Sequence, residues 1–260
     1  MNILETIIEH KKIEVEKRRS NISIAELEKH ELFGRKIYSL KEFLLDETKT
    51  GIIAEFKRRS PSKGIINDSA GVEDVTNAYT KYGASCLSVL TDFDFFGGTK
   101  DDLLRARVNA IPILRKDFII EEYQVVESRA MGADVILLIA ACLTPERVKK
   151  LASFARQLEL EILLEIHNEE ELQHICDEID LVGINNRDLK TFRVDINRSI
   201  ELSKKIHAGK IKIAESGISN VETIGLLKQH GFKGFLVGEN FMKEKDPGEA
   251  FREFVEHLMS

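Results

Sequence analysis

Eight short apolar runs, each followed by a longer amphipathic segment, limit the folds open to this chain more than any other feature of its sequence. The runs are rich in β-branched side chains and leucine and lie at Gly51–Lys57, Cys86–Thr91, Pro112–Lys116, Asp134–Ala140, Glu161–Ile166, Leu181–Asn185, Ile211–Ser216 and Gly234–Gly238. Apolar residues recur at helical spacing at Val72–Tyr82, Lys100–Asn109, Glu122–Met131, Pro145–Glu159, Glu169–Glu178, Asn197–Ile206, Val221–His230 and Pro247–Met259. Strands that alternate with helices form βαβ units, so we expect a parallel sheet.

The number of these units favours a closed barrel over an open sheet. The chain has 260 residues, and a barrel of eight strand–helix units often has about 250. An open doubly wound sheet usually carries a glycine-rich phosphate turn after its first strand, and this sequence has none. We therefore predict an α/β fold, a (β/α)₈ TIM barrel, that forms one domain over residues 1–260.

Residues 1–50 precede the first strand and form an N-terminal extension of the predicted barrel. Apolar residues at Ile3, Leu4, Ile7 and Ile8 indicate one amphipathic helix over Asn2–Arg19. Shorter helical pieces follow near residues 24–30 and 40–46. Our hypothesis is that the extension packs on the barrel near its mouth.

Local signals mark several helix ends. Thr144 and Pro145 are typical of an N-cap residue and the first helical position. Gly83, Gly132 and Gly231 stand where helices would end, and glycine commonly closes a helix there.

Composition and charge exclude several classes of protein. No apolar run reaches 18 residues, so we expect no transmembrane helix. The first 20 residues are charged and lack the apolar stretch of a secretory signal. A net charge of −6 argues against a nucleic-acid partner. An anionic small molecule would have to be attracted by local cations.

The three cysteines bear on the cellular compartment. Cys86, Cys142 and Cys176 are odd in number and lie in apolar stretches, so we interpret them as buried thiols outside any disulfide framework. This predicts a cytoplasmic protein. An isolated barrel domain is compatible with a monomer, which is the state that we expect.

Active sites of such barrels lie at the carboxyl ends of the strands, and polar side chains gather there in this sequence. Glu55 and Lys57 are two residues apart and therefore share one face of the first strand. The other strand ends carry Arg115 and Lys116, Glu165, Asn185 to Arg187, and Glu215 with Ser216. One such end alone is most simply a solvated terminus, but the set at one rim favours a functional site.

Charges of both signs at this rim predict acid–base chemistry. An ionised group inside a barrel is costly without a partner. Lys57 and Lys116 can be offset by Glu55, Glu165 and Glu215, and such neighbours shift the pKa values that proton transfer uses. No HExxH motif or Asp/His cluster has the spacing of metal ligands, so we expect no metal.

Small residues after the last two strands indicate a phosphate site. Ser216 and Gly217 follow the seventh strand, and Gly238 follows the eighth. Small residues let backbone N–H groups approach an anion, and a short helix that starts at residue 239 or 240 would direct its N-terminus at that anion. The loops after strands seven and eight are the usual phosphate position in this fold. Turn glycines are common, so the signal comes from the matching pair.

The loop after the first strand is cationic from Arg58 to Lys63. Such a loop can be no more than solvated surface. The functional interpretation is a mobile loop that closes over the substrate, in which Ser60 donates a hydrogen bond to phosphate and Lys63 steers the anion. Strand alternation predicts that Arg58 faces outward, unless the strand has already ended before it.

Two further features have simple structural interpretations. His167 follows Glu165 near the rim, and we interpret it as a surface loop residue. Phe93, Phe95 and Phe96 can be loop packing, or they can line an apolar pocket for an aromatic ring.

The sequence resembles the indole-3-glycerol phosphate synthase family along residues 1–258. The residues that carry the resemblance are Ile53–Gly64, Ser88–Asp92, Phe96–Gly98, Leu114–Phe118, Leu164–Ile166, Gly183–Leu189 and Ala214–Ile218. The strings Glu55–Gly64 and Gly183–Leu189 are long and specific.

The resemblance implies a lyase of tryptophan biosynthesis that needs no cofactor. It would convert 1-(2-carboxyphenylamino)-1-deoxyribulose 5-phosphate to indole-3-glycerol phosphate, CO₂ and water. Lys116 would be the general acid of ring closure. Either Lys57 with Glu55 or Lys116 with Glu165 would serve the dehydration.

The remaining roles that the resemblance implies concern binding. Asn185 and Glu215 would hold the substrate hydroxyls and the catalytic lysines. The phosphorylated small molecule would be bound by Ser60, Ser216, Gly217, Gly238 and Arg187, with its ring against Phe96 and Leu137. Family members often have a small residue after the last glycine, whereas Glu239 stands here, which makes this residue a doubtful phosphate ligand.

Two other functions remain open from the residues alone. A Schiff-base aldolase on a phosphate-binding barrel would use Lys116 as its nucleophile. A non-catalytic phosphosugar-binding barrel would keep the pocket, but it has no need of paired lysines and carboxylates.

Overall fold

A computed structural model describes residues 3–188 and 193–260 of the chain. Two residues named above lie outside these ranges: Asn2, the first residue of the expected N-terminal helix, and Leu189, the last residue of one of the specific strings.

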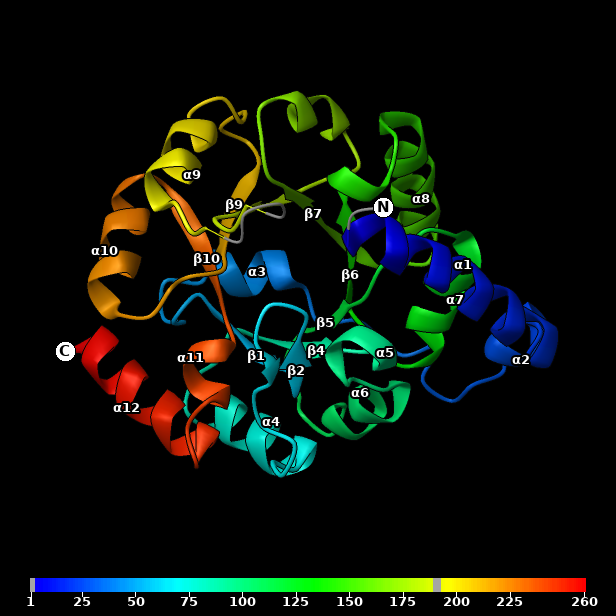
Figure 1. The fold of residues 1–260 in the computed structure, drawn as a ribbon, viewed down its shortest axis with the longest axis horizontal. Helices are drawn as coiled ribbons and strands as arrows, with labels where there is room; N and C mark the ends of the chain where they lie inside the picture. Colours follow the sequence, from blue (N-terminus) through cyan, green and yellow to red (C-terminus); the bar gives the residue numbers. More distant parts are fainter. Residues whose placement is uncertain (1–2, 189–192) are drawn as a thin grey trace.

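Eight parallel strands close into a barrel, which confirms the predicted fold class (Figure 1). The strands are β1 (Ile52–Phe56), β4 (Cys86–Leu90), β5 (Ile113–Lys116), β6 (Val135–Ile139), β7 (Glu161–Ile166), β8 (Leu181–Asn185), β9 (Ile211–Glu215) and β10 (Phe232–Val237). They follow one another around the barrel in chain order, and β10 pairs with β1 to close it. All eight expected runs are therefore strands of one sheet.

Helices surround the barrel in the positions that the amphipathic segments predict. The longer ones are α4 (Val72–Lys81), α6 (Lys100–Ala106), α7 (Glu122–Ala130), α8 (Pro145–Gln157), α9 (Ile196–Ser203), α10 (Val221–Gln229) and α12 (Pro247–Met259). Short elements at the carboxyl ends of the strands are α5 (Phe93–Phe96), α11 (Glu239–Met242), the 3₁₀ helix η1 (Ala140–Cys142) and the strands β2 (Arg59–Ser60) and β3 (Gly64–Ile65), which pair as a hairpin.

One expected helix is wrong. The segment Glu169–Glu178 contains only the 3₁₀ helix η2 (Glu170–His174). In an α-helix the backbone N–H of Ile175 would donate to the carbonyl of Glu171. Nδ1 of His174 contacts that carbonyl oxygen at 3.1 Å instead, and the N–H of Ile175 donates to Leu172. The side chain of His174 thus replaces a helical hydrogen bond and tightens the turn.

The predicted helix ends are confirmed. Thr144 caps α8, its side chain accepts a hydrogen bond from the N–H of Arg147, and Pro145 follows in the first turn. Gly83, Gly132 and Gly231 have φ angles of 99°, 81° and 79°, which glycine adopts at little cost.

Strand alternation divides the apolar residues into two layers. Outward-facing side chains such as Ile52, Ala54 and Phe56 pack against the surrounding helices. Inward-facing side chains such as Ile53 and Leu163 fill the lower part of the barrel. Towards the carboxyl ends of the strands, several of the inward-facing side chains are polar.

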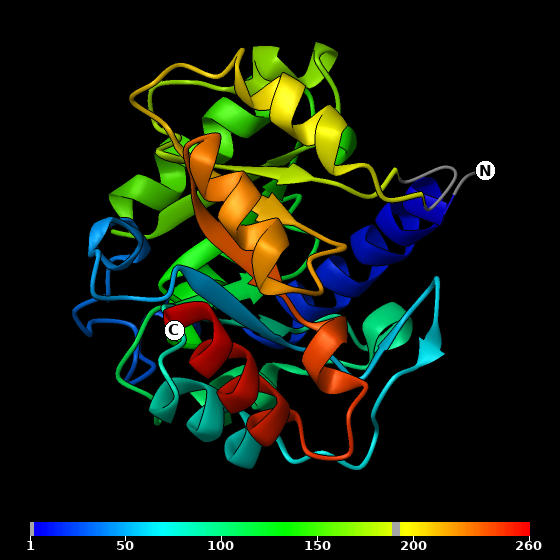
Figure 2. The ribbon, with the colours of Figure 1, turned by 90° about the vertical axis from the view of Figure 1, so that its left-hand side faces the viewer.

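The N-terminal extension contacts the two opposite ends of the barrel. Helix α3 (Leu40–Leu45) closes the amino-terminal end, where Leu40 and Leu44 join the interior cluster and the Ser39 hydroxyl donates to Glu161 at the start of β7. Helix α1 (Ile3–Asn21) lies at the carboxyl end, where it lines the barrel mouth, and α2 (Ile24–Leu27) lies beyond it beside α7 (Figures 1 and 2). Helix α1 therefore lies near the mouth, as expected of the extension, whereas α3 lies at the opposite end.

A buried ion cluster joins α1 to the barrel. Nζ of Lys11 is inaccessible to solvent and lies 2.8 Å from Asp92, 2.9 Å from Asp117 and 2.6 Å from Glu14. Burial disfavours the charged amine, but these carboxylates outweigh it and raise the pKa of Lys11 above its ordinary value. Asp92 and Asp117 follow β4 and β5, so Lys11 fastens α1 to two strand ends.

Two predictions from composition can be compared with the structure. Within residues 3–188 and 193–260, the helices lack the combination of length and apolar character that crossing a membrane requires. All three cysteines are unpaired, but only Cys86 is buried. Cys142 and Cys176 are partly exposed: Cys142 lies in η1, directly after β6, and Cys176 lies shortly after η2, between β7 and β8.

Substitution of Lys11 by methionine should destabilise the protein by about 3–5 kcal/mol, because it leaves buried carboxylates without their cation. The free energy of unfolding from urea denaturation measures the change. Lys12→Met is the matched control, since Lys12 is exposed and pairs with exposed Glu9. It should change stability by less than about 1 kcal/mol. Equal effects of the two substitutions would contradict the role given to Lys11.

Candidate functional site

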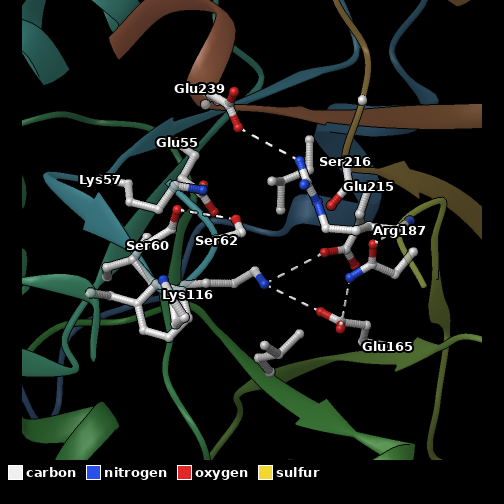
Figure 3. Close-up of a pocket in the computed structure, with 18 of the residues that line it drawn as sticks. Glu55, Lys57, Ser60, Ser62, Lys116, Glu165, Arg187, Glu215, Ser216 and Glu239 are labelled. Atoms are coloured by element: carbon white, nitrogen blue, oxygen red, sulfur yellow. Dashed lines mark hydrogen bonds and ion pairs between the residues drawn. The ribbon is translucent and has the colours of Figure 1, made fainter. Parts of the chain in front are cut away.

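A cavity of about 460 Å³ opens at the carboxyl ends of the strands, between the barrel rim and α1 (Figure 3). All thirteen candidate residues from the sequence line it: Glu55, Lys57, Ser60, Phe96, Lys116, Leu137, Glu165, Asn185, Arg187, Glu215, Ser216, Gly217 and Gly238. The fold therefore brings the predicted residues together in one place.

Strand alternation explains why these side chains meet. On β5, β7 and β9 a polar residue is at the last inward position, above an apolar one. Lys116 stands above Leu114, Glu165 above Leu163, and Glu215 above Ile213, in the same inward series. The parallel register then places neighbouring strand ends level with one another, for example Asn185 beside Glu215.

Lys116 lies at the centre of the polar layer (Figure 3). Its Nζ is 3.2 Å from Oε2 of Glu165 and 3.6 Å from Oε2 of Glu215. Nδ2 of Asn185 donates to Oε1 of Glu165 at 3.1 Å. Both carboxylates are almost completely buried. In the described part of the chain, Oε1 of Glu215 is buried without a hydrogen-bond partner.

The environment separates the pKa values of these three groups. Burial penalises the charged amine of Lys116, but Glu165, Glu215 and Glu55 raise its pKa above the ordinary value. Burial raises the pKa of Glu165, but Lys116 and His167 lower it below the usual range. Burial and the charge of Glu165 raise the pKa of Glu215 to about 8. At neutral pH the cluster therefore holds an ammonium ion, one carboxylate and one protonated carboxyl group.

Lys57 and Glu55 form a second pair across the cavity from Lys116 (Figure 3). Nζ of Lys57 donates to Oε1 of Glu55 at 2.6 Å, and Glu55 is buried while Lys57 is partly open to the cavity. The cavity thus has a lysine–carboxylate pair on each of two sides.

Two glycines make room for the buried carboxylates. A Cβ atom at Gly183 in β8 would stand 2.0 Å from Oε1 of Glu215, and one at Gly238 would stand 2.6 Å from Oε1 of Glu55. Gly238 had been selected from the sequence for phosphate, but Gly183 had no assigned role. Its position two residues before Asn185 on the inward face was the signal that could have identified it.

The turn after β9 is shaped for close backbone approach. Ser216 and Gly217 both have positive φ angles, 69° and 72°, and a non-glycine residue rarely adopts this conformation. A Cβ at Gly217 would stand 2.3 Å from Val194. Helix α11 begins at Glu239, directly after Gly238, so the expected short helix is present.

The side chain of Glu239 extends to two cations at the cavity mouth. Its carboxylate lies 3.4 Å from Nζ of Lys63. It also lies 3.6 Å from Nη2 of Arg187 (Figure 3). It therefore pairs with cations from two separate loops.

The loop after β1 has one residue facing outward and others at the mouth. Arg58 forms an ion pair of 2.6 Å with Asp102 of α6, which confirms that it faces away from the cavity. Ser60 and Ser62 line the cavity, and their hydroxyl oxygens are 3.4 Å apart.

Apolar side chains form one wall of the cavity. Phe96 and Leu137 lie there as expected, together with Phe118 and Ile139. Helix α1 adds three residues that the sequence had identified only as its apolar face, namely Ile3, Leu4 and Ile7. Of the other two phenylalanines, Phe93 is 62% exposed and Phe95 packs edge-on against His10, so the pocket interpretation holds only for Phe96.

The interpretation of His167 as a surface residue is wrong. Only 6% of it is exposed, and its ring lies between two carboxylates, 3.1 Å from Glu165 and 3.3 Å from Glu171. The short spacing to Glu165 was visible in the sequence, but the position of Glu171 depends on the fold of η2.

Within the described residues, no group of three His, Cys, Asp or Glu side chains is arranged to hold a metal ion. The absence of a metal from the reaction stays a prediction.

Comparison with known proteins places the chain in a family. The family model for indole-3-glycerol phosphate synthase matches residues 4–254. A Bacteroides thetaiotaomicron protein named indole-3-glycerol phosphate synthase is 46% identical over 258 residues, 99% of each chain. A Bordetella pertussis protein of the same name is 40% identical over 259 residues, 98% of this chain and 99% of the other.

Solved structures at much lower identity share the fold. The tryptophan synthase α subunit of Legionella pneumophila aligns with a TM-score of 0.62 at 15% identity, over 86% of this chain and 97% of the other. A 3-hexulose-6-phosphate synthase of Salmonella typhimurium aligns with a TM-score of 0.63 at 11% identity, over 80% and 98%. These likenesses concern the barrel alone. The match of the family model over almost the whole chain, with the 46% identity to a named relative, shows that the chain belongs to the indole-3-glycerol phosphate synthase family.

Proposed function

We propose that this protein converts 1-(2-carboxyphenylamino)-1-deoxyribulose 5-phosphate to indole-3-glycerol phosphate, CO₂ and water in tryptophan biosynthesis, without a cofactor. The observation that carries the proposal is the Lys116 ammonium group held between Glu165 and Glu215 inside a cavity that has an apolar wall and a cationic mouth. Family membership supports the same reaction.

The substrate has three parts that the cavity can distinguish. Its phosphate would lie against the backbone of Ser216, Gly217 and Gly238, with Ser60 from the loop after β1. Its aromatic ring would pack on Phe96 and on Leu137. The ring carboxylate would then face the cations of the mouth, which include Arg187 and Lys57.

Ring closure requires a proton donor beside the substrate carbonyl. The ring carbon that bears the carboxylate attacks C2′, and the carbonyl oxygen gains negative charge. Lys116 would give that oxygen a proton, because its neighbouring carboxylates hold it in the ammonium form. The C–COO⁻ bond then breaks, its electrons restore the aromatic ring, and CO₂ leaves. Asn185 and Glu215 would hold the substrate hydroxyls and the lysine in place.

Dehydration requires a second acid and a base. The C2′ hydroxyl departs as water, and the adjacent C1′ loses a proton to complete the indole double bond. Lys57 and Glu55 are in direct contact and lie apart from Lys116, so they could act while Lys116 is still without its proton. We assign them to this step as acid and base, with Glu165 retained as the partner of Lys116.

The electrostatics disfavour the Schiff-base alternative. A nucleophilic amine must be neutral, and enzymes that use one lower its pKa by burial or by nearby cations. The carboxylates around Lys116 raise its pKa instead. Borohydride reduction in the presence of substrate should therefore leave Lys116 unmodified.

We also propose that residues 1–50 are part of a single barrel domain, and that the protein is a cytoplasmic monomer with a small phosphorylated molecule as its ligand. The compartment and the oligomeric state rest on the sequence arguments given above.

Lys116→Ala should lower kcat by about 10²–10⁴-fold, the usual contribution of a positioned acid, while substrate still binds. Indole fluorescence measures turnover and equilibrium titration measures binding. Lys212→Ala is the matched control, because Lys212 is also a strand lysine but reaches outside the barrel to the carbonyl of His230. Its activity should stay near that of the wild type. A normal kcat in the Lys116 variant would remove this residue from the acid role.

Gly183→Ala should lower activity by about 10²-fold, because its methyl group would push the Glu215 carboxylate from its place, and misplacement of about 1 Å can have this effect. Gly225→Ala in α10 is the control, since a Cβ there meets nothing within 4 Å. That variant should be fully active. Unchanged kcat in Gly183→Ala would show that the position of Glu215 is unimportant.

The pH profile of kcat/KM should fall above about pH 8. Glu215 is protonated below its pKa of about 8 and ionised above it, and the added negative charge makes Lys116 a weaker acid. In Glu215→Gln the fall near pH 8 should be absent, because an amide does not titrate. The same fall in the variant would assign it to another group. Fluorescence assays across the pH range provide the profile.

A further inference from the structure

A second ion pair supports Glu165 from the side away from Lys116. Nε2 of His167 lies 3.1 Å from Oε1 of Glu165, while Nδ1 lies 3.3 Å from Oε2 of Glu171. All three side chains are largely buried, with 4% of Glu165, 6% of His167 and 9% of Glu171 exposed. His167 does not line the cavity. It therefore touches the candidate catalytic carboxylate without any access to the substrate.

We propose that His167 and Glu171 are positioning residues that hold Glu165 for the reaction. The inference rests on the proposed function and adds two residues to it. Oε1 of Glu165 forms an ion pair with His167 and accepts a hydrogen bond from the Asn185 amide, while Oε2 faces Lys116. The chain Glu171–His167–Glu165–Lys116 thus extends from the surface helix η2 into the active site.

Glu171 is itself held firmly, which a positioning role requires. Its Oε2 accepts the backbone N–H of His167 at 2.7 Å, and its Oε1 accepts from Nδ2 of Asn168 at 2.9 Å. The N–H of Glu171 donates to Oδ1 of Asn168. His174 tightens η2 into a 3₁₀ helix directly after Glu171. The departure from the expected α-helix therefore occurs at the residue that contacts His167.

The charges in this chain balance when His167 is an imidazolium ion. Burial lowers the pKa of His167, but contact with Glu165 and Glu171 outweighs it and raises the pKa to about 9. The two positive charges of Lys116 and His167 then balance the two negative charges of Glu165 and Glu171. Glu215 is protonated at neutral pH. The thiol of Cys142 on η1 adds no charge, because burial and the two carboxylates raise its pKa to about 12.

Loss of the imidazolium ion would act through Glu165. Without it Oε1 of Glu165 loses its charged partner, and the side chain gains freedom to leave Lys116. Its pKa should also rise, because an adjacent positive charge normally lowers a carboxyl pKa by about 1–3 units. Substrate binding should change little, since His167 does not reach the cavity.

The first test compares kcat with KM. His167→Gln keeps the approximate size and a donor but cannot be charged, and it should lower kcat about tenfold, a part of the 10²–10⁴-fold due to a positioned acid or base. KM should stay within about twofold. Glu171→Gln should behave in the same way. Glu170→Gln is its matched control, because it is the same substitution on the neighbouring, exposed residue of η2, and it should retain wild-type kcat.

The second test asks whether His167 acts through Glu165. In a Glu165→Gln background the further change His167→Gln should have an effect below about twofold, because the partner charge is already absent. In the histidine NMR titration, His167 of the wild type should titrate near pH 9, and Glu171→Gln should lower that value. A tenfold effect that persists in the Glu165→Gln background would overturn the proposal, as would titration of His167 at its ordinary pKa in the wild type.

Different outcomes would contradict the proposed reaction and the positioning role of His167. If the wild type makes no indole, the proposed function is wrong, whatever the histidine titration shows. If the wild type is active and His167→Gln has wild-type kcat, the reaction stands and the positioning role is wrong. Circular dichroism of each variant separates both results from a loss of folding.

Discussion

The ion pair between Lys116 and Glu165 at the carboxyl end of the barrel is the interaction on which the rest of the site depends. Neither charge would be stable there alone, because the free energy lost when a charged group is buried away from water is large and needs a close opposite charge to offset it. Each therefore makes the other possible. Glu215 joins them as a protonated group, because burial and then the negative charge of Glu165 beside it raise its pKa.

Several features that look unrelated serve this arrangement. Gly183 leaves the space that the Glu215 carboxylate occupies. Asn185 and His167 fix one side of Glu165. Helix α1 covers the mouth with apolar residues and is fastened through Lys11 to Asp117, the residue next to Lys116 in the chain. Exclusion of water from the cavity strengthens every charge interaction inside it.

The barrel and most of the site could be predicted from the sequence because both depend on short-range patterns. Alternating apolar runs define the strands, and the last inward residue of a strand must lie at the rim, which identifies Lys116, Glu165 and Glu215. The features that were missed depend on individual side-chain contacts, which the pattern of apolar residues does not reveal. His167 lies between Glu165 and Glu171 of η2, and η2 differs from the expected α-helix because His174 takes a backbone carbonyl. The space at Gly183 is set by a side chain from the neighbouring strand.

The central claim is that the buried Lys116 cluster couples ring closure to loss of the substrate carboxylate. The most direct measurement is the amount of CO₂ released for each indole product, with substrate labelled at the ring carboxylate. Folded protein should release one labelled CO₂ for each indole-3-glycerol phosphate formed. Folded protein that binds the substrate but releases no labelled CO₂ and forms no indole would contradict it.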